Sequence, residues 1–293
     1  MSRGKQLMAE LNERVLVCEG AMGSMLTAKA IKYRNTGEVN LTHPDAVAEI
    51  HRAYQEAGAE VFQTNTFAAN LGMLRRAGLA DQAAAIQSAA IRILRQAVGP
   101  EAYVAANGGP TGALIAPLGA MSYEEAVATY RQQFEVTLAG PVDLVLLETF
   151  ESIEEVTAAI EAVRAVGANI PIAVTMSFSM PNGRTSMGID GGTAARELAA
   201  QSVDIIGANC GHIDGLLIAI REMSTTVDVP LMAQANAGQP QLIAGQAVYQ
   251  GTPREAGELA AELISAGVRL IGGCCGTTPE HIREIARVAR ASA

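Results

Sequence analysis

Tryptophan is absent from this sequence, and aromatic residues make up only 4% of its 293 residues. Charged residues are also few, at 17%, and the net charge of −9 argues against nucleic acid or an anionic membrane as a main partner. No apolar run approaches the roughly 20 residues that a membrane helix needs. Residues 1–14 are polar and lack the apolar core of a signal peptide, so we expect a cytoplasmic protein.

Two common nucleotide-binding loops are also missing. No G-x-G-x-x-G follows the first apolar run, and no loop of the G-x-x-x-x-G-K type occurs. The 29 glycines follow no triplet repeat, which excludes collagen. Four cysteines in a long cytoplasmic chain do not form a disulfide framework, and their clustering instead favours metal binding or catalysis.

The dominant pattern is an alternation between short apolar runs and longer helical patterns, which occurs eight times. The runs predict strands at Val15–Cys18, Val61–Thr64, Tyr103–Ala106, Leu144–Leu147, Ile172–Ser177, Ile205–Ala208, Leu231–Gln234 and Leu270–Gly272. The helical patterns predict helices at Pro44–Ala57, Asp81–Val98, Tyr123–Leu138, Ile153–Val166, Thr193–Gln201, Gly215–Met223, Pro253–Ala266 and Pro279–Ala291. Strands that are apolar throughout are typical of a parallel sheet covered on both faces.

The alternation continues without a break in composition, which favours a single α/β domain over residues 1–293. Eight βα units predict one (β/α)8 barrel of the TIM type. An open, doubly wound sheet stays possible, because periodicity does not show whether a sheet closes.

Two segments, 203–211 and 268–276, end in the same way, with glycine, then cysteine, then glycine. They place Cys210, Cys274 and Cys275 at the C-terminal ends of strands six and eight, where barrels carry catalytic residues. In a closed barrel one strand separates these ends, so the three thiolates can meet. Three protein ligands with one open position are typical of catalytic zinc, and soft sulfur selects zinc over magnesium or calcium. We therefore predict a Zn²⁺ site.

Other readings of the cysteines remain open. All three residues could be ordinary buried cysteines, Cys274 and Cys275 could form a vicinal disulfide, or one thiol could act as a nucleophile without metal. Cys18 lies inside the first strand and is expected in the core.

The four histidines are not expected among the metal ligands. His212 follows Cys210 by two positions, but a fourth protein ligand would close the site to substrate. We expect His43, His51 and His281 to be surface or capping residues.

Six motifs carry a family resemblance along essentially the whole chain. They are Gly272–Ile282, Gly207–Cys210, Glu19–Gly23, Gln63–Phe67, Glu148–Phe150 and Gly183–Thr185. Through them the chain resembles the homocysteine S-methyltransferase family. The last motif is more similar to the homocysteine module of cobalamin-dependent methionine synthase than to the betaine-using branch.

The resemblance implies a homocysteine-binding barrel domain in which the three cysteines hold zinc. It also implies that homocysteine is activated as a zinc thiolate and methylated to methionine. Glu19 departs from the aspartate that is usual in the first motif. Its carboxylate lies about one methylene farther out, so the acceptor could be homocysteine or a related small thiol.

The amino-acid part of such an acceptor needs partners of its own. Glu19 and Glu148 end strands one and four, and both can reach the barrel mouth to hold an ammonium group. Thr64 and Thr66, with the backbone N–H groups of Gly20 and Ala21, are candidates for the carboxylate. Asn209 adjoins Cys210 and is a candidate hydrogen-bond donor to a ligand sulfur.

The methyl donor is less clearly indicated. No folate or cobalamin module is evident, so we expect a donor from solution or on a partner, preferably methylcobalamin carried by a separate corrinoid protein. S-methylmethionine is the second candidate. Betaine is the third, since aromatic cages for quaternary ammonium favour tryptophan.

Two other classes compete with methyl transfer. Gly272 and Gly273, followed by a helix capped by Thr278, could cradle phosphate in a metal-free lyase or isomerase. A non-catalytic zinc-binding subunit is the other possibility.

Overall fold

The computed structural model describes residues 2–243 and 246–292. Its main sheet has eight parallel strands in the order β1-β10-β7-β6-β5-β4-β3-β2. The strands are β1 (Leu16–Val17), β2 (Val61–Gln63), β3 (Tyr103–Gly108), β4 (Leu144–Phe150), β5 (Ile172–Met176), β6 (Ile205–Asn209), β7 (Leu231–Ala235) and β10 (Val268–Gly273). Each predicted strand is present within a few residues of its expected bounds.

The first and second strands close this sheet into a barrel. Cys18 forms a parallel bridge with Val61. The Glu19 N–H donates to the Val61 carbonyl at 3.0 Å, and the Glu60 N–H donates to the Val17 carbonyl at 2.8 Å. The prediction of a single (β/α)8 barrel is therefore confirmed, and an open sheet is excluded.

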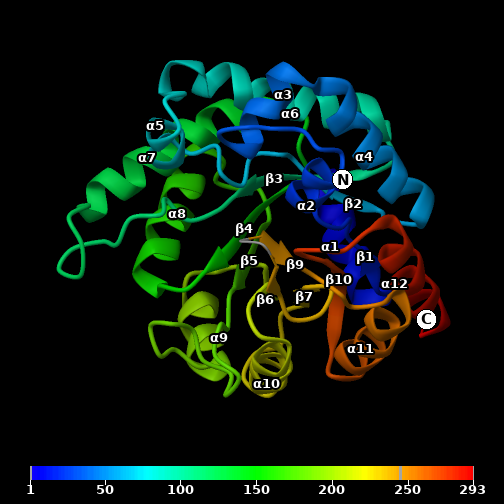
Figure 1. Cartoon of the computed structure of the whole chain (residues 1–293). Coiled ribbons are helices and arrows are strands. Elements are labelled where there is room, and N and C mark those ends of the chain that lie inside the picture. The colour runs from blue at the N-terminus through cyan, green and yellow to red at the C-terminus, as the bar shows by residue number, and fades with distance from the viewer. Residues whose placement is uncertain (1, 244–245, 293) are drawn as a thin grey trace.

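Helices surround the strands (Figure 1). They are α1 (Arg3–Glu13), α2 (Met22–Ala28), α3 (Val39–Thr42), α4 (Pro44–Ala57), α5 (Leu71–Arg76), α6 (Ala83–Val98), α7 (Tyr123–Thr137), α8 (Ile153–Val166), α9 (Gly191–Ala200), α10 (Ile213–Ser224), α11 (Pro253–Ser265) and α12 (Pro279–Ala291), with short 3₁₀ turns at Thr36–Glu38 and Ala80–Gln82. Within the described residues, none of them has both the length and the apolar character needed to cross a bilayer.

Helix α1 was not expected from the sequence. Its Leu7 and Leu11 are fully buried and pack with residues that point into the barrel, including Leu16, Leu144 and Met232. The helix therefore closes the N-terminal end of the barrel with apolar side chains. Cys18 belongs to the same cluster, as expected for a core cysteine.

A second unexpected element interrupts the path from β7 to α11. Strands β8 (Gln241–Ile243) and β9 (Gln246–Val248) pair antiparallel as a hairpin outside the barrel. Residues 244–245, between them, lie outside the described part of the chain. The hairpin follows the C-terminal end of β7, so it stands on the face where barrels carry their sites.

Candidate metal and substrate site

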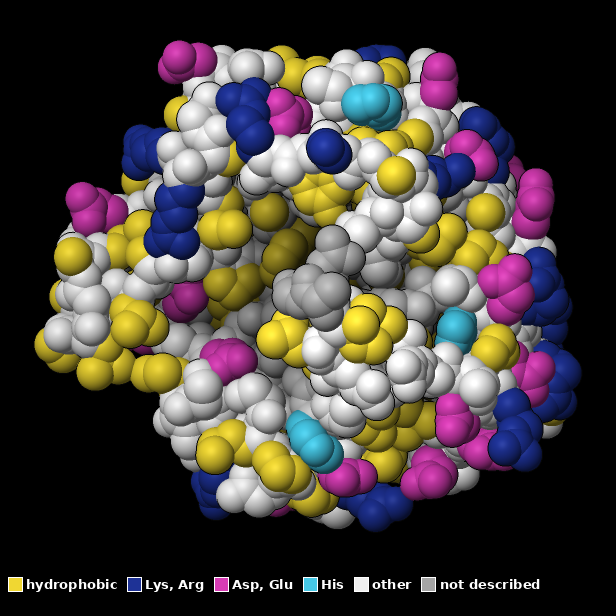
Figure 2. Space-filling view, viewed as in Figure 1, with side chains coloured by type: hydrophobic (Ala, Val, Ile, Leu, Met, Phe, Trp, Pro, Cys, Tyr) yellow, Lys and Arg dark blue, Asp and Glu magenta, His cyan; other side chains and the backbone are white. Residues whose placement is uncertain are grey.

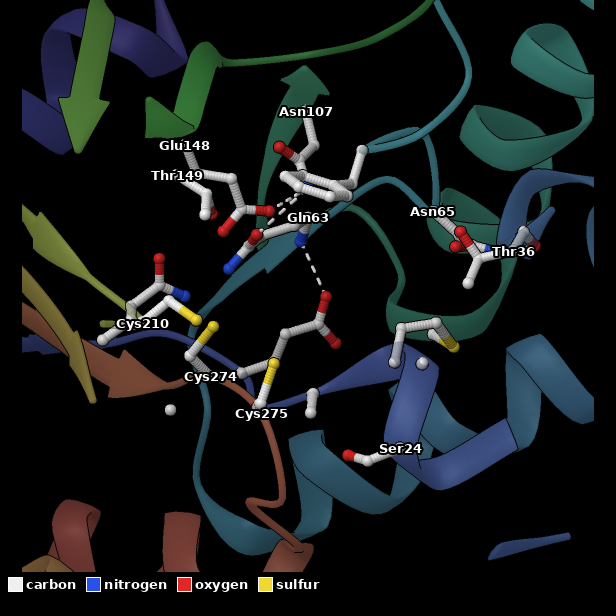
Figure 3. A pocket seen from close by; sticks show the side chains of 18 of the residues that line it. Ser24, Thr36, Gln63, Asn65, Asn107, Glu148, Thr149, Cys210, Cys274 and Cys275 are labelled. Carbon is white, nitrogen blue, oxygen red and sulfur yellow. Dashed lines mark hydrogen bonds between the residues drawn. The ribbon is translucent and has the colours of Figure 1, made fainter. Parts of the chain in front are cut away.

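The three clustered cysteines meet at the C-terminal end of the barrel (Figure 3). The Sγ atoms of Cys210, Cys274 and Cys275 all lie within 4.8 Å of one another. All three are free cysteines, so the vicinal disulfide considered above is not formed. Their arrangement satisfies the geometric requirement for sharing one ion.

Strand β7 holds the two cysteine segments together. The Cys210 N–H donates to the Gln234 carbonyl at 3.0 Å, and the Cys274 N–H donates to the Ala235 carbonyl at 2.8 Å. Cys210 itself has a φ of +55°, a left-handed conformation that is uncommon for a residue with a side chain. This turn at the end of β6 directs its sulfur toward the sulfurs that follow β10.

The thiols strongly affect one another's ionisation. Hydrogen bonds from Cys274 and Cys275 lower the pKa of Cys210, and the same contacts with Cys210 raise the pKa values of Cys274 and Cys275. The three sulfurs are thus close enough for the ionisation of one to affect the other two. A soft cation beside them would favour all three thiolates, and this donor set fits zinc.

Asn209, the last residue of β6, joins several parts of the site. Its side chain is fully buried. The Nδ2 atom lies 2.7 Å from Thr149 Oγ1 and 3.8 Å from Cys274 Sγ, and Oδ1 accepts from the Thr149 N–H at 2.8 Å. The residue therefore links the end of β4 to a sulfur of the cysteine cluster.

Glu148 lies in β4 and is 8% exposed. Its Oε1 accepts a 2.6 Å hydrogen bond from Asn107, and its Oε2 lies 3.4 Å from the Asn209 amide nitrogen. Burial raises the pKa of Glu148 to about 7, and the negative charges of Cys210 and Glu19 act in the same direction. An incoming cation would relieve both the desolvation and the repulsion.

Each carboxylate oxygen of Glu19 has a partner within 2.8 Å. Its Oε1 accepts from the Gln63 N–H at 2.7 Å, and its Oε2 lies 2.8 Å from Nδ1 of His51. His51 is only 1% exposed, so the expectation of a surface or capping role for it was wrong. Sequence reasoning missed this pair because 32 residues separate its members, which only the folded barrel brings together.

The other histidines lie away from the cysteine sulfurs. His212 caps α10, with Nδ1 accepting from the Asp214 N–H at 3.2 Å. His281 takes part in the capping box that starts α12, although it is buried rather than exposed. His43 begins α4 and is exposed.

A cavity of about 370 Å³ adjoins the cysteine cluster. Among the sequence-predicted residues, its lining includes Glu19, Gly20, Ala21, Thr64, Glu148 and the three cysteines. Residues that were not named as candidate metal or acceptor-binding residues also line it, namely Met22, Gly23, Ser24, Thr36, Gln63, Asn65, Phe67, Asn107, Thr149, Gln234 and Gly273. Most of them lie next to candidate residues in the same sequence motifs. Their position in those motifs was therefore the signal that could have identified them.

The two predicted threonines differ in position. Thr64 borders the cavity, whereas Thr66 is fully buried outside its lining. The Thr66 hydroxyl donates to the Asn107 carbonyl at 2.6 Å and lies 2.6 Å from the Thr64 hydroxyl. The Thr64 hydroxyl in turn accepts from the Asn107 N–H at 2.9 Å, so both hydroxyls join the segment after β2 to β3. Of the two, only Thr64 adjoins the space that a substrate would enter.

The hairpin contributes a residue that the sequence analysis did not identify. Tyr249, directly after β9, forms a hydrogen bond with Cys275, and burial raises the pKa of its phenol. Tyr249 packs on Gly276, where an added Cβ would clash with the Tyr249 side chain. No motif marks this tyrosine, because the hairpin interrupts the regular βα alternation.

The family model of homocysteine S-methyltransferase matches residues 16–289. Methionine synthase from Mycobacterium leprae is 33% identical over 299 residues, which cover 96% of this chain and 25% of that protein. Methionine synthase from Mycobacterium tuberculosis is 32% identical with the same coverage. The chain thus spans about a quarter of the length of these curated relatives.

Solved structures share the fold. The metallated form of the homocysteine methyltransferase MmuM from Escherichia coli superimposes with a TM-score of 0.80 at 24% sequence identity. The match covers 96% of this chain and 99% of that one.

Proposed function

Because this chain belongs to the homocysteine S-methyltransferase family, we propose that it methylates homocysteine to methionine with Zn²⁺ held by Cys210, Cys274 and Cys275. The observation that carries the proposal is the convergence of three sulfurs at a cavity that also contains two buried carboxylates. Structural cysteines would not need such a cavity. A phosphate site would not place Glu19 and Glu148 beside its ligand.

The chemistry requires a thiolate at neutral pH. A free thiol has a pKa near 8.5, so only a few per cent is ionised at pH 7. Bound zinc would deprotonate a thiol that coordinates it, and three cysteinate ligands would leave one position for that thiol. Asn209 would fix the Cys274 sulfur through its hydrogen bond.

The chain's own acids and amides would orient the acceptor. Glu148 and Glu19 would bind the α-ammonium group by charge-assisted hydrogen bonds. Our candidates for binding the carboxylate are Thr64 and the backbone N–H groups around Gly20 and Ala21, which line the same cavity. Thr66 would hold the Thr64 hydroxyl in place through the hydrogen bond between them. These contacts would hold the sulfur of the acceptor toward the cysteine cluster.

We infer that the donor is a methylcorrinoid carried by a separate protein. A corrin ring is too large for a cavity of about 370 Å³, so it would sit above the mouth. The loops and the β8–β9 hairpin on this face carry exposed apolar side chains, among them Leu114, Leu118, Met180, Met187, Leu242 and Ile243. Figure 2 shows a hollow on this face with hydrophobic side chains around it. Such a rim fits a protein partner.

S-methylmethionine is the second candidate donor, because it is small enough to enter the cavity. Betaine is disfavoured by the lining. Among the described residues that line the cavity, Phe67 is the one aromatic side chain, whereas a quaternary ammonium is usually held by several.

A metal analysis combined with a donor panel tests the proposal. The purified protein should contain one zinc per chain and methylate homocysteine from methylcobalamin faster than from S-methylmethionine or betaine. Cys274→Ala should lose zinc and methyl transfer together. The matched control is Cys18→Ala, which removes a buried thiol outside the cluster and should retain both.

The competing classes give different results in the same assays. Methyl transfer by a metal-free Cys274→Ala variant would contradict the proposal. Absence of metal together with stabilisation by phosphate would indicate a lyase or isomerase. Zinc without methyl transfer to any thiol would indicate a non-catalytic subunit.

A further inference from the structure

The two carboxylates of the cavity are held in different ways. Glu148 receives amide N–H groups at 2.6 and 3.4 Å from Asn107 and Asn209. Glu19, which is 3% exposed, receives the Gln63 backbone N–H at 2.7 Å and faces the imidazole of His51 at 2.8 Å. Among the described residues, His51 is therefore the one side chain that is hydrogen-bonded to the Glu19 carboxylate.

The environment of His51 fixes which ring nitrogen carries the hydrogen. Its Nε2 is buried and has no hydrogen-bond partner among the described residues. A hydrogen on Nε2 would be buried without an acceptor, whereas a hydrogen on Nδ1 can be donated to the Glu19 carboxylate. The ring is therefore a donor to Glu19 through Nδ1.

His51 reaches the cavity only through Glu19. It lies on α4, and no atom of it lines the cavity. One turn farther along α4, the Tyr54 hydroxyl lies 2.9 Å from the carbonyl oxygens of both Ala21 and Thr277. Helix α4 thus supports the segment after β1 and the segment after the paired cysteines.

We propose that His51 is a positioning residue for the ammonium group of the acceptor. By donating to Oε2 it holds the Glu19 carboxylate in one orientation, and each carboxylate oxygen keeps a second lone pair for an incoming N–H. A shorter aspartate at position 19 could not reach His51 from the same backbone. This inference rests on the proposed function, because it assumes an amino-acid thiol in the cavity.

The pair should therefore determine selectivity for an amine. Homocysteine presents its ammonium to Glu19 and Glu148, whereas 4-mercaptobutyrate has the same thiol and carboxylate without the amine. Loss of the His51 hydrogen bond should impair homocysteine and spare the deaminated analogue. A general structural defect would impair both thiols alike.

Three substitutions make the test specific. His51→Phe removes the donor and should raise KM for homocysteine roughly 10- to 100-fold, with kcat and zinc content little changed. His51→Asn places an amide N–H near the position of Nδ1 and should restore KM to within a few-fold of wild type. His43→Asn, at the exposed start of the same helix, is the control and should have no effect.

The outcomes separate this inference from the proposed function. If wild type binds homocysteine in calorimetry without methylating it, the proposed function fails, and the binding constants of the variants still test His51. Equal losses for homocysteine and 4-mercaptobutyrate, or an unchanged affinity in His51→Phe, would overturn the inference.

A second route remains if His51→Phe does not fold. Glu19→Asp should raise KM for homocysteine by a similar factor, and ¹⁵N NMR of wild type should show the His51 hydrogen on Nδ1. A hydrogen on Nε2 would contradict the proposed donor.

Discussion

The two ends of the barrel are built from opposite kinds of side chain. At the N-terminal end, α1 inserts Leu7 and Leu11 among the apolar residues of the strands, and both are fully buried. At the C-terminal end, three cysteines and two carboxylates surround a cavity. One end therefore stabilises the fold while the other is free to carry groups that destabilise it.

The polar end also holds two residues in left-handed backbone conformations. Thr149 and Cys210, both at C-terminal strand ends, have φ values of +67° and +55°. Such conformations cost on the order of 1–3 kcal/mol each and persist only where the surroundings impose them. Here Asn209 imposes part of this geometry by hydrogen bonding to the Thr149 backbone and hydroxyl. The difference between the ends predicts which substitutions affect activity and which affect stability.

The largest expected effect is at the polar end. Glu148→Gln keeps an acceptor for Asn107 but removes the negative charge, which should cost about 3–4 kcal/mol of homocysteine binding. KM for homocysteine should therefore rise by a few hundred-fold, with zinc still bound. Steady-state kinetics with metal analysis measures both. Glu154→Gln, an exposed acid on α8, is the control, and an unchanged KM in Glu148→Gln would remove this residue from the site.

The next effect is at the apolar end, where a substitution should lower stability and leave substrate binding unchanged. Leu11→Ala leaves a cavity between α1 and the barrel, so the free energy of unfolding should fall by about 3 kcal/mol. KM and zinc content should stay near wild type. Urea denaturation measures the loss, and Lys5→Ala on the exposed side of α1 is the control. A loss below about 1 kcal/mol would mean that α1 contributes little to closing the barrel.

The barrel and the cysteine cluster could be predicted because each depends on a local pattern. Buried parallel strands are apolar throughout, so β2 was expected from Val61 and begins there. The repeated ending around Cys210 and Cys274 placed the thiols one strand apart once a barrel was assumed. Both inferences needed only chain order and the rule that barrel sites lie at C-terminal strand ends.

The remaining features depend on contacts that the local sequence does not encode. Helix α1 is mostly polar, and only its position beneath the barrel explains why Leu7 and Leu11 are buried. The Glu19–His51 pair and the contact of Tyr249 with Gly276 join residues that are far apart in the chain. Propensity and periodicity do not predict such pairs, because tertiary packing alone brings them together.

The smallest expected effect is a pH dependence of the free energy of unfolding that arises at the polar end alone. Burial raises the pKa of Glu148 to about 7, above the value of about 4.5 for an exposed glutamate, so the folded metal-free protein binds the proton more tightly than the unfolded chain. Its stability should therefore be greatest below pH 4.5 with respect to this group and fall as the pH rises through 7. Glu148→Gln does not titrate, so its stability relative to wild type should increase by about 2 kcal/mol between pH 5 and pH 8. Urea unfolding of both metal-free proteins at the two pH values measures this difference.

Leu11→Ala is the control at the apolar end and should show no such pH dependence. A pH-independent difference for Glu148→Gln would mean that neighbouring groups already offset the cost of burying the charged carboxylate at the polar end of the barrel.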